Sequence, residues 1–514
     1  MTDGRPSDPI ETVTIVGGGD SGLLSALLVK RFNPDITVTV VDDFQREIPQ
    51  VGKSTFSHIL DTLHGVLDID RSRFIDEVKP VWKASVYFED WCGCEPFHVP
   101  FDEHMLIPPS PGPGRFDALY HRYENRSFET VCTELVKTGN TPIKEHRDEL
   151  SLYDHVAYHL STDRFNELLR TVCTEREIEL IDDEIVEVNL TDGSITAVES
   201  EQTTYEADLY VDATGFERTL VGEMPTEFTS FDFPLDSAVV AKADVSLSEI
   251  VPATVVTSGD CGWFWQIDTV DWRDLGYVYS SAHCSEAAAR REFVDRHDGR
   301  ISESDVTTYA FQSGTYERAW VNNCLAVGNA LGFVEPLQST ALTTNAQLVQ
   351  KLAILLADNR RLNHRGIRDI YNSYVRDIWA NIYDFISIHY RYASGETEFW
   401  EDASSINDDR RLAQYTDGYR KNGFTSHTEF DRQHGRTGRI FSQWMFDLVL
   451  TNVGVESDFY ERVSVDVNPT VEREIAKQDE KIRQDVRSHV SYEDVYGDPE
   501  LLERLTGSRR SRGV

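Results

Sequence analysis

Two stretches of the chain have the residue types and spacing of backbone anion sites. The first is GGGDSG at 17–22, which follows an apolar, β-branched run and leads into an apolar stretch of helical spacing. In such a strand–turn–helix unit, glycines permit a tight turn, the approach of a pyrophosphate and close packing of helix on strand. Asp42, with Asp43 as the alternative, lies about twenty residues further on, where a carboxylate binds a ribose hydroxyl. The pattern predicts a dinucleotide site formed by Gly17, Gly19, Ser21, Gly22 and Asp42.

The second stretch, GNALGFVEPLQSTAL at 328–342, has the pattern of a strand end, a turn and a helix that begins near Ser339. The first turn of a helix presents free backbone N–H groups and a partial positive charge, so it binds anions. We therefore expect an anion site at the start of this helix.

The elements that must position these residues follow from the apolar pattern of the chain. Buried runs that end in glycine or aspartate alternate with stretches of helical spacing, which predicts an α/β fold. The expected strands are 12–16, 37–41, 207–211, 238–243 and 276–281, with a hairpin over 180–200 that turns at Asp192-Gly193. The expected helices are 23–31, 157–172 and most of 347–392, whereas the stretch from 466 is highly charged and its end, SRRSRGV, is expected to be mobile.

Composition excludes several classes of function. The 514 residues include 88 acidic and 50 basic ones, a net charge of −38, which argues against a nucleic-acid partner. The acid is dispersed, which favours adaptation to high salt over a single acidic interaction surface. No run of about 18 apolar residues and no signal peptide is present, so we expect a cytoplasmic protein without a membrane partner. The seven cysteines lack metal-site spacing, so we expect reduced thiols and no metal.

Three segments in a fixed order favour FAD over NAD as the dinucleotide. They are the glycine loop, ADLYVDATGF at 207–216 and LAVGNA at 325–330. This order resembles the flavin monooxygenase-like fold, a Rossmann-like FAD-binding domain with an inserted substrate β-sheet. The resemblance implies that Gly215, Gly328 and Asn329 also contact the cofactor.

Further blocks narrow the resemblance to one family. They are VGKST at 51–55, WKASV at 82–86, GWFWQI at 262–267, GYVYSS at 276–281, EPLQST at 335–340, DFISIHY at 384–390 and FW at 399–400. Together, over roughly residues 12–460, they resemble the flavin-dependent tryptophan halogenases. The resemblance implies an FAD-binding domain at 1–350, a helical substrate-covering region at 351–465 and a charged C-terminal region at 466–514.

The family resemblance implies a chemistry and a set of site residues. Reduced FAD (FADH2), O2 and chloride or bromide give hypohalous acid, which passes through a tunnel to a lysine and halogenates an electron-rich indole- or tryptophan-like ring. Lys83 is the implied lysine, which either forms a haloamine or holds the acid by a hydrogen bond. Burial would lower its pKa toward the neutral amine that a haloamine needs. The other implied residues are Gln338 and Glu335 for catalysis, Thr340 and Ala341 for halide, Lys53 beside the flavin, and Trp263, Trp265, Ser339, Phe399 and Trp400 for the substrate and tunnel.

The chain departs from the family pattern at two important positions. Gln338 stands where the family has a glutamate, and a carboxamide is no base near neutral pH, so Glu335 is a substitute candidate. Lys53 also replaces a glutamate. We expect a separate flavin reductase as partner, since no second nucleotide motif is present, and a homodimer by family analogy. Two alternatives stay open, a flavin-dependent monooxygenase and a catalytically silent FAD-binding homologue.

Overall fold

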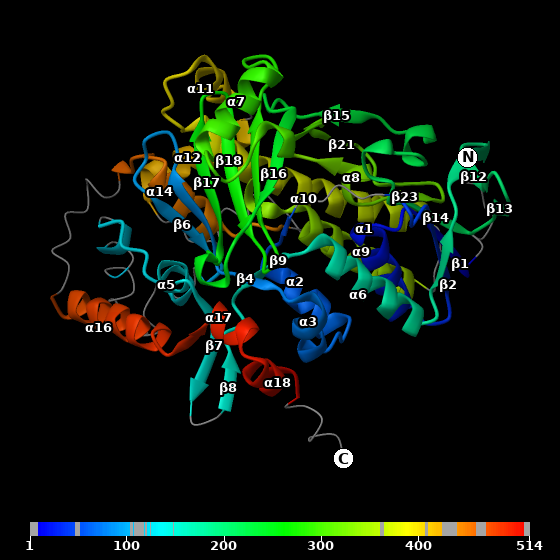
Figure 1. The fold of residues 1–514 in the computed structure, drawn as a ribbon. Helices are drawn as coiled ribbons and strands as arrows, with labels where there is room; N and C mark the ends of the chain where they lie inside the picture. Colours follow the sequence, from blue (N-terminus) through cyan, green and yellow to red (C-terminus); the bar gives the residue numbers. More distant parts are fainter. Residues whose placement is uncertain are drawn as a thin grey trace.

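The computed structural model describes residues 9–46, 52–102, 106, 118, 121–123, 125–146, 149–359, 364–406, 410–423, 439–458 and 469–507. Two sheets and a set of long helices form the body of the molecule (Figure 1). Strands of the two sheets alternate along the chain, so the second sheet is inserted into the first part of the fold. Among the described residues, no helix has both the length and the apolar character needed to cross a bilayer.

The first sheet carries the glycine loop. Its order is β10–β2–β1–β14–β23–β22, with bounds Glu179–Asp182, Thr37–Asp42, Thr12–Val16, Leu209–Asp212, Cys324–Ala326 and Trp320–Val321. All its pairs are parallel except β22–β23. Helices α1 (Asp20–Phe32), α6 (Thr162–Glu175) and α9 (Ala341–Asp358) pack together against it. This Rossmann-like arrangement confirms the α/β prediction and brings the carboxyl ends of β1, β2 and β14 to one edge.

The second sheet has seven strands and two differently packed faces. Its order is β20–β16–β19–β18–β17–β5–β6, with bounds Thr307–Ala310, Ser237–Ala243, Arg273–Tyr279, Gly262–Asp268, Ala253–Gly259, Ser85–Asp90 and Phe97–Pro100. Alternation along β18 sends Trp263 and Trp265 into the main core, whereas Phe264 packs with Phe293 of α7 (Glu286–Arg296) on the other face. The two tryptophans therefore face the interior of the protein.

Lys83 lies on a short three-stranded sheet between the two large ones. Strand β9 (Ala157–Leu160) is central, with β3 (Lys53–Ser54) and β4 (Val81–Lys83) antiparallel on its two sides. The predicted helix 157–172 is therefore wrong in its first four residues, and α6 begins only at Thr162. Strand pairing on both sides satisfies the backbone of these four buried residues and overrides their helical spacing.

The helical part packs against α9 and against β6 of the second sheet. Its main helices are α10 (Arg365–Arg391), α11 (Glu398–Ala403), α12 (Arg410–Asn422) and α14 (Gln443–Asn452). The predicted helical stretch 347–392 is thus α9 followed by α10. The predicted hairpin over 180–200 is confirmed from Ile185 onward as β11 (Ile185–Thr191) and β12 (Ser194–Ser200), and it turns at Asp192-Gly193, both with positive φ. Residues 180–182 instead belong to β10, which pairs with β2 of the first sheet.

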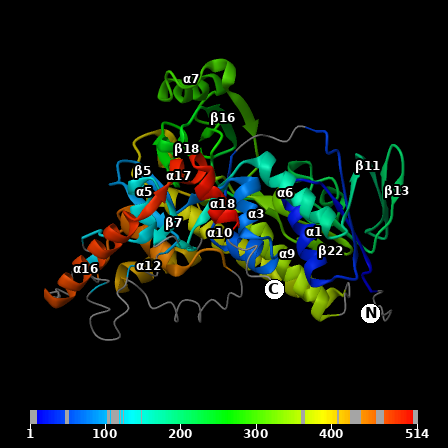
Figure 2. The ribbon, with the colours of Figure 1, turned by 60° about the horizontal axis from the view of Figure 1, so that its bottom comes forward.

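The charged C-terminal region folds back onto the molecule (Figure 2). It forms α16 (Pro469–Val486), β25 (His489–Ser491), α17 (Tyr492–Gly497) and α18 (Pro499–Gly507), elements that the charge pattern did not predict. β25 pairs with β7 (Asn140–His146), and the Tyr492 hydroxyl donates to the carbonyl of Trp82 (3.0 Å) and accepts from its N–H (3.1 Å). The C-terminal region therefore braces the strand that carries Lys83, while the segment SRRSRGV lies outside the described residues.

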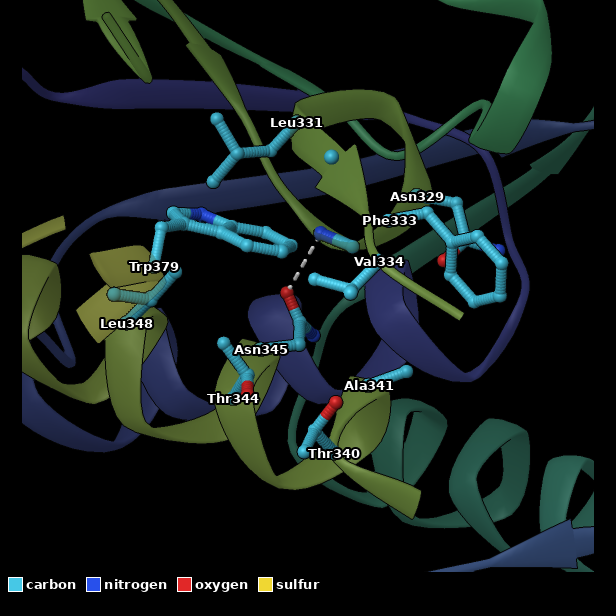
Figure 3. A pocket seen from close by; sticks show the side chains of 12 residues that line it. Asn329, Leu331, Phe333, Val334, Thr340, Ala341, Thr344, Asn345, Leu348 and Trp379 are labelled. Carbon is cyan, nitrogen blue, oxygen red and sulfur yellow. Dashed lines mark hydrogen bonds between the residues drawn. The ribbon is translucent and has the colours of Figure 1, made fainter. Parts of the chain in front are cut away.

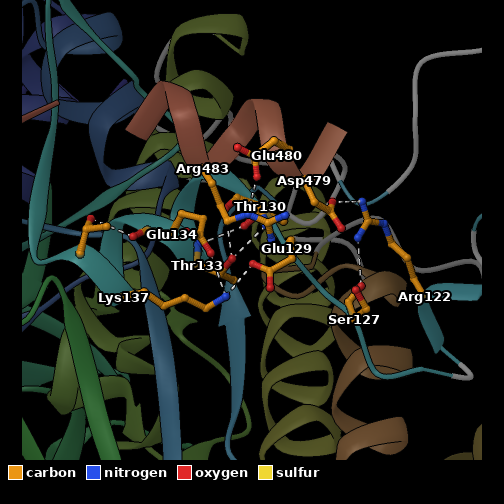
Figure 4. A network of polar contacts seen from close by, with 11 residues as sticks. Arg122, Ser127, Glu129, Thr130, Thr133, Glu134, Lys137, Asp479, Glu480 and Arg483 are labelled. Carbon is orange, nitrogen blue, oxygen red and sulfur yellow. Dashed lines mark hydrogen bonds and ion pairs between the residues drawn. The ribbon is translucent and has the colours of Figure 1, made fainter. Parts of the chain in front are cut away.

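α16 packs on α5 (Val131–Thr138), and polar contacts fasten it to the chain before α5 (Figure 4). The fully buried guanidinium of Arg122 donates to Asp479 (2.8 Å) and to the carbonyl of Ser127 (3.0 Å). A buried arginine needs such a partner, because desolvation of an unpaired charge is costly.

Candidate functional site

The glycine loop has the shape of a dinucleotide cradle. Gly17 has φ +107°, and a Cβ on it would lie 2.4 Å from the carbonyl oxygen of Ala213. A Cβ on Gly22 would lie 1.9 Å from the Gly17 oxygen, so helix and strand pack too closely for any side chain. A Cβ on Gly19 would meet nothing within 4 Å, and no side chain caps the start of α1. Open space beside free helix N–H groups suits a phosphate, so these residues fit a dinucleotide.

Asp42 and Asp212 fix the chain around this cradle. Asp42 ends β2 and accepts a hydrogen bond from the Gly18 N–H, while burial raises its pKa. Asp212 is fully buried and accepts from the N–H groups of Leu220 and Val221, both at 2.8 Å, which anchors the loop that contains Gly215. Asp42 therefore lies directly beside the glycine loop.

Lys53 and Asn345 connect the cradle to the rest of the site. Lys53 forms an ion pair with Asp20 at the start of α1 (2.6 Å), so its positive charge is compensated. Asn345 on α9 accepts from the Gly328 N–H (3.1 Å) and donates to the carbonyl of Ser21 (3.2 Å), as Figure 3 shows in part. No sequence motif marks Asn345, because a lone asparagine in a helix has no characteristic spacing.

A small cavity lies at the start of α9 (Figure 3). Its volume is about 20 Å³, and its lining includes Gly328, Asn329, Thr340, Ala341 and Asn345. This volume holds one water-sized particle. The preceding turn is unusual, because Gln338 and Ser339 both have positive φ, +67° and +56°. The structure therefore joins the predicted anion residues to the predicted cofactor residues in one pocket.

Lys83 is completely buried on the other side of this turn. Its Nζ donates to the carbonyl oxygen of Thr55 (3.2 Å) and to the hydroxyl of Ser339 (3.1 Å). Among the described residues no carboxylate forms an ion pair with it, and burial holds the pKa of Lys83 well below its usual range.

Glu335 and Gln338 lie on the same turn with different partners. The Glu335 carboxyl accepts from the indole N–H of Trp263 (3.1 Å) and from the Tyr390 hydroxyl (3.2 Å). Burial raises the pKa of Glu335 to about 8. Gln338 contacts His389 through Nε2 (3.0 Å). His389 was not among the predicted site residues, although the DFISIHY block contains it.

The remaining predicted residues form an aromatic layer around these groups. Trp265 packs on Gly276, where a Cβ would lie 2.0 Å from the indole ring. Trp400 stacks on Tyr390 with ring centres 5.9 Å apart and donates its N–H to the carbonyl of Gly259 (3.0 Å). Phe399 contacts Trp400 edge-on. Both rings are therefore connected to Glu335 through Tyr390, which stacks on Trp400 and donates to the Glu335 carboxyl.

Comparisons with known proteins place the chain in a family. The profile of the family described as "Tryptophan halogenase" matches residues 12–468. The chain is 27% identical to the tryptophan 6-halogenase SttH of Streptomyces toxytricini, over 83% of this chain and 87% of that one. It is 28% identical to the 7-chloro-L-tryptophan 6-halogenase KtzR of Kutzneria sp. (strain 744), over 76% and 82%.

A solved structure gives the same result. The crystal structure of MibH, described as a lathipeptide tryptophan 5-halogenase, superposes with a TM-score of 0.83 at 27% identity and covers 98% of this chain and 97% of that one. Profile, sequence and structure agree over nearly the whole chain. The chain therefore belongs to the tryptophan halogenase family and is a flavin-dependent oxidoreductase of the halogenase type.

Proposed function

We propose that this enzyme uses reduced FAD, O2 and chloride or bromide to halogenate an electron-rich aromatic ring of the indole or tryptophan type, with Lys83 as the residue that delivers the halogen. The observation that carries the proposal is the environment of Lys83. Relatives named as tryptophan halogenases support the choice of ring.

The surroundings of Lys83 favour its neutral amine. A neutral amine has two N–H bonds and one lone pair, and Thr55 and Ser339 accept two hydrogen bonds from it. The lone pair then stays free to react with an electrophilic halogen. Because desolvation penalises the ammonium form, the buried amine is nucleophilic at a pH where an exposed lysine is protonated.

The turn at 335–341 connects two functions. Bound reduced FAD would supply, with O2 and halide, the hypohalous acid. The backbone N–H groups of Thr340 and Ala341 would hold the halide beside the cofactor residues Gly328 and Asn329. On the interior side, Ser339 orients the amine of Lys83. Glu335, on the same turn, accepts from the indole N–H of Trp263 and so fixes the position of that ring.

The proposal predicts a product with a halogen isotope pattern. Purified protein in high salt receives FAD, a separate flavin reductase with NADH, oxygen and chloride or bromide, and a panel of tryptophan, indoles and phenols. Mass spectrometry then detects the product. A halide-independent gain of one oxygen atom would assign a monooxygenase instead, and flavin oxidation that yields only peroxide would assign a silent homologue.

Substitution separates the role of the amine from that of packing. Lys83→Met keeps the length of the side chain and removes the nitrogen, so we expect a folded protein that binds FAD and forms no halogenated product. Lys351→Met, at a half-buried lysine on α9 that lies over the ring of Tyr374, is the matched control and should retain activity. Halogenation by Lys83→Met at the wild-type rate would refute the role of Lys83.

A further inference from the structure

The carboxamide of Gln338 is held by a buried histidine in a defined orientation. Gln338 is 1% exposed and His389 fully buried, and their Nε2 atoms lie 3.0 Å apart. On its other side the imidazole contacts the carbonyl oxygen of Phe385, one turn earlier on α10, through Nδ1 (2.9 Å). Both nitrogens of the ring are therefore engaged.

These contacts fix where the hydrogens are. A carbonyl only accepts, so Nδ1 carries the hydrogen and donates to Phe385. A neutral imidazole has one N–H, so Nε2 is an acceptor and Gln338 must present its N–H to it. The carboxamide oxygen Oε1 consequently points away from His389. Among the described residues it has no hydrogen-bond partner, although it is buried.

The surroundings of His389 keep it neutral and immobile. The rings of Phe88, Trp91 and Phe385 pack on it, and the indole N–H of Trp91 donates to its carbonyl (2.8 Å). No charged group is among these contacts, and burial lowers the pKa of His389 to about 4. The imidazole is thus a neutral base over the working range of pH.

The free oxygen lies on the turn that holds the reactive amine. Gln338 directly precedes Ser339, whose hydroxyl accepts from Lys83 (3.1 Å). Halogenation of an aromatic ring leaves one carbon bearing both hydrogen and halogen, and aromaticity returns only when a base removes that proton. Glu335, which burial keeps protonated up to about pH 8, already accepts from Trp263 and Tyr390, so it is a poor base at neutral pH.

We propose that Gln338 and His389 together remove this ring proton, an inference that rests on the proposed function. The C–H bond breaks and its electron pair returns to the ring, while the proton passes to Oε1 of Gln338. At the same time the Nε2–H proton of Gln338 passes to Nε2 of His389. The products are the aromatic halide, the imidic acid form of Gln338 and the imidazolium of His389. Release of the O–H proton to water and return of the other proton from His389 restore the resting state.

This pairing explains how the chain tolerates the loss of the family glutamate. The protonated ring intermediate is a strong acid, so even a weakly basic imidazole accepts its proton. His389 acts through Gln338 and positions it, whereas Gln338 touches the substrate.

The test combines three variants with a ring-deuterated substrate. His389→Gln keeps an acceptor for the Gln338 N–H but cannot take a proton. With bromide and tryptophan deuterated on all ring carbons, we expect its product rate to fall on the order of 100-fold and to show an isotope effect that the wild type lacks. Gln338→Glu supplies a carboxylate base directly, so the double variant Gln338→Glu/His389→Gln should regain the rate. His297→Gln, at a half-buried histidine on the far face of the second sheet, is the control.

A second readout does not depend on turnover. In protein labelled with ¹⁵N-histidine, the signals missing from His389→Gln belong to His389. We expect the Nδ1–H tautomer in the resting wild type, and a raised pKa of His389 in Gln338→Glu, because a carboxylate then faces Nε2. Melting temperature and FAD binding verify that each variant is folded.

The outcomes distinguish this inference from the function on which it rests. If the wild type makes the halogenated product and His389→Gln has the same rate and isotope effect, the inference is overturned but the proposed function stands. An Nε2–H tautomer, or a double variant that stays inactive, would also overturn it. A wild type that makes no halogenated product would refute the proposed function and the inference together.

Discussion

Glu335 gives the stability of this protein a specific dependence on pH. Its carboxyl is 2% exposed, and burial raises its pKa to about 8 from an ordinary value of 4.5. Between these two values the folded protein keeps the proton and the unfolded chain releases it. The folded state then binds more protons than the unfolded state, so the free energy of unfolding falls as pH rises through this window.

The magnitude follows from the size of the shift. One pKa unit corresponds to about 1.4 kcal/mol, so the loss grows from nothing near pH 4.5 to about 3 kcal/mol at pH 7 and about 5 kcal/mol at pH 8. Glu335→Gln removes the titration. Glutamine resembles the protonated acid, with one oxygen to accept from Trp263 and Tyr390 and a donor in place of the acid O–H.

The assay compares melting temperatures of the variant and the wild type from pH 5 to pH 8 in one high-salt buffer. For a chain of 514 residues, about 5 kcal/mol corresponds to roughly 4 °C. We expect nearly equal melting temperatures at pH 5 and a variant that is more stable by several degrees at pH 8. Glu201→Gln, at an exposed position, controls for the substitution itself. A difference that is constant with pH, or a variant less stable at pH 8, would refute the reasoning.

Three further predictions concern the cofactor loop, the C-terminal region and the charge. Gly19→Ala should leave the melting temperature of the FAD-free protein unchanged but weaken FAD binding in a fluorescence titration. Gly22→Ala should instead destabilise the fold itself, because its Cβ would lie 1.9 Å from the Gly17 oxygen. Tyr492→Phe removes both hydrogen bonds to the backbone of Trp82 and should cost about 1–3 kcal/mol in denaturant unfolding, with a matching loss of halogenation; an unchanged midpoint would show that the brace is dispensable. With a net charge of −38, the melting temperature should rise from dilute buffer to about 2 M KCl, and a maximum in dilute buffer would contradict adaptation to salt.

The strand–turn–helix shape of the glycine loop could be predicted because its signals are local. Each glycine of the loop at 17–22 either contacts a neighbouring residue too closely for a side chain or borders open space, all within one strand–turn–helix unit. The spacing of the glycines in the sequence therefore suffices to predict the loop. Strand β9 was missed for the opposite reason. Its four residues form a strand because β3 and β4, about 100 and 75 residues earlier in the chain, pair with both of its edges.

The same distinction applies to the C-terminal region. Tyr492 and Tyr496 sit in a charged sequence without an apolar period, yet their rings pack on Trp82, 410 residues away from Tyr492, and position the strand of Lys83. Nothing in the local pattern indicates that contact. The composition of this region predicted a charged tail. The packing of Tyr492 and Tyr496 on Trp82 instead holds the region against the strand of Lys83.

Gln338 shows where sequence reasoning about a site stops. The sequence identifies the replaced glutamate and rules out a carboxylate at that position. It cannot identify a compensating base, because His389 lies 51 residues further along and reaches Gln338 only through the packing of α10 against the turn. The orientation of the carboxamide then depends on a third group, the Phe385 carbonyl, which selects the tautomer of the imidazole. The replacement of the glutamate by Gln338 looks disabling in the sequence. The fold shows that Gln338 is paired with His389.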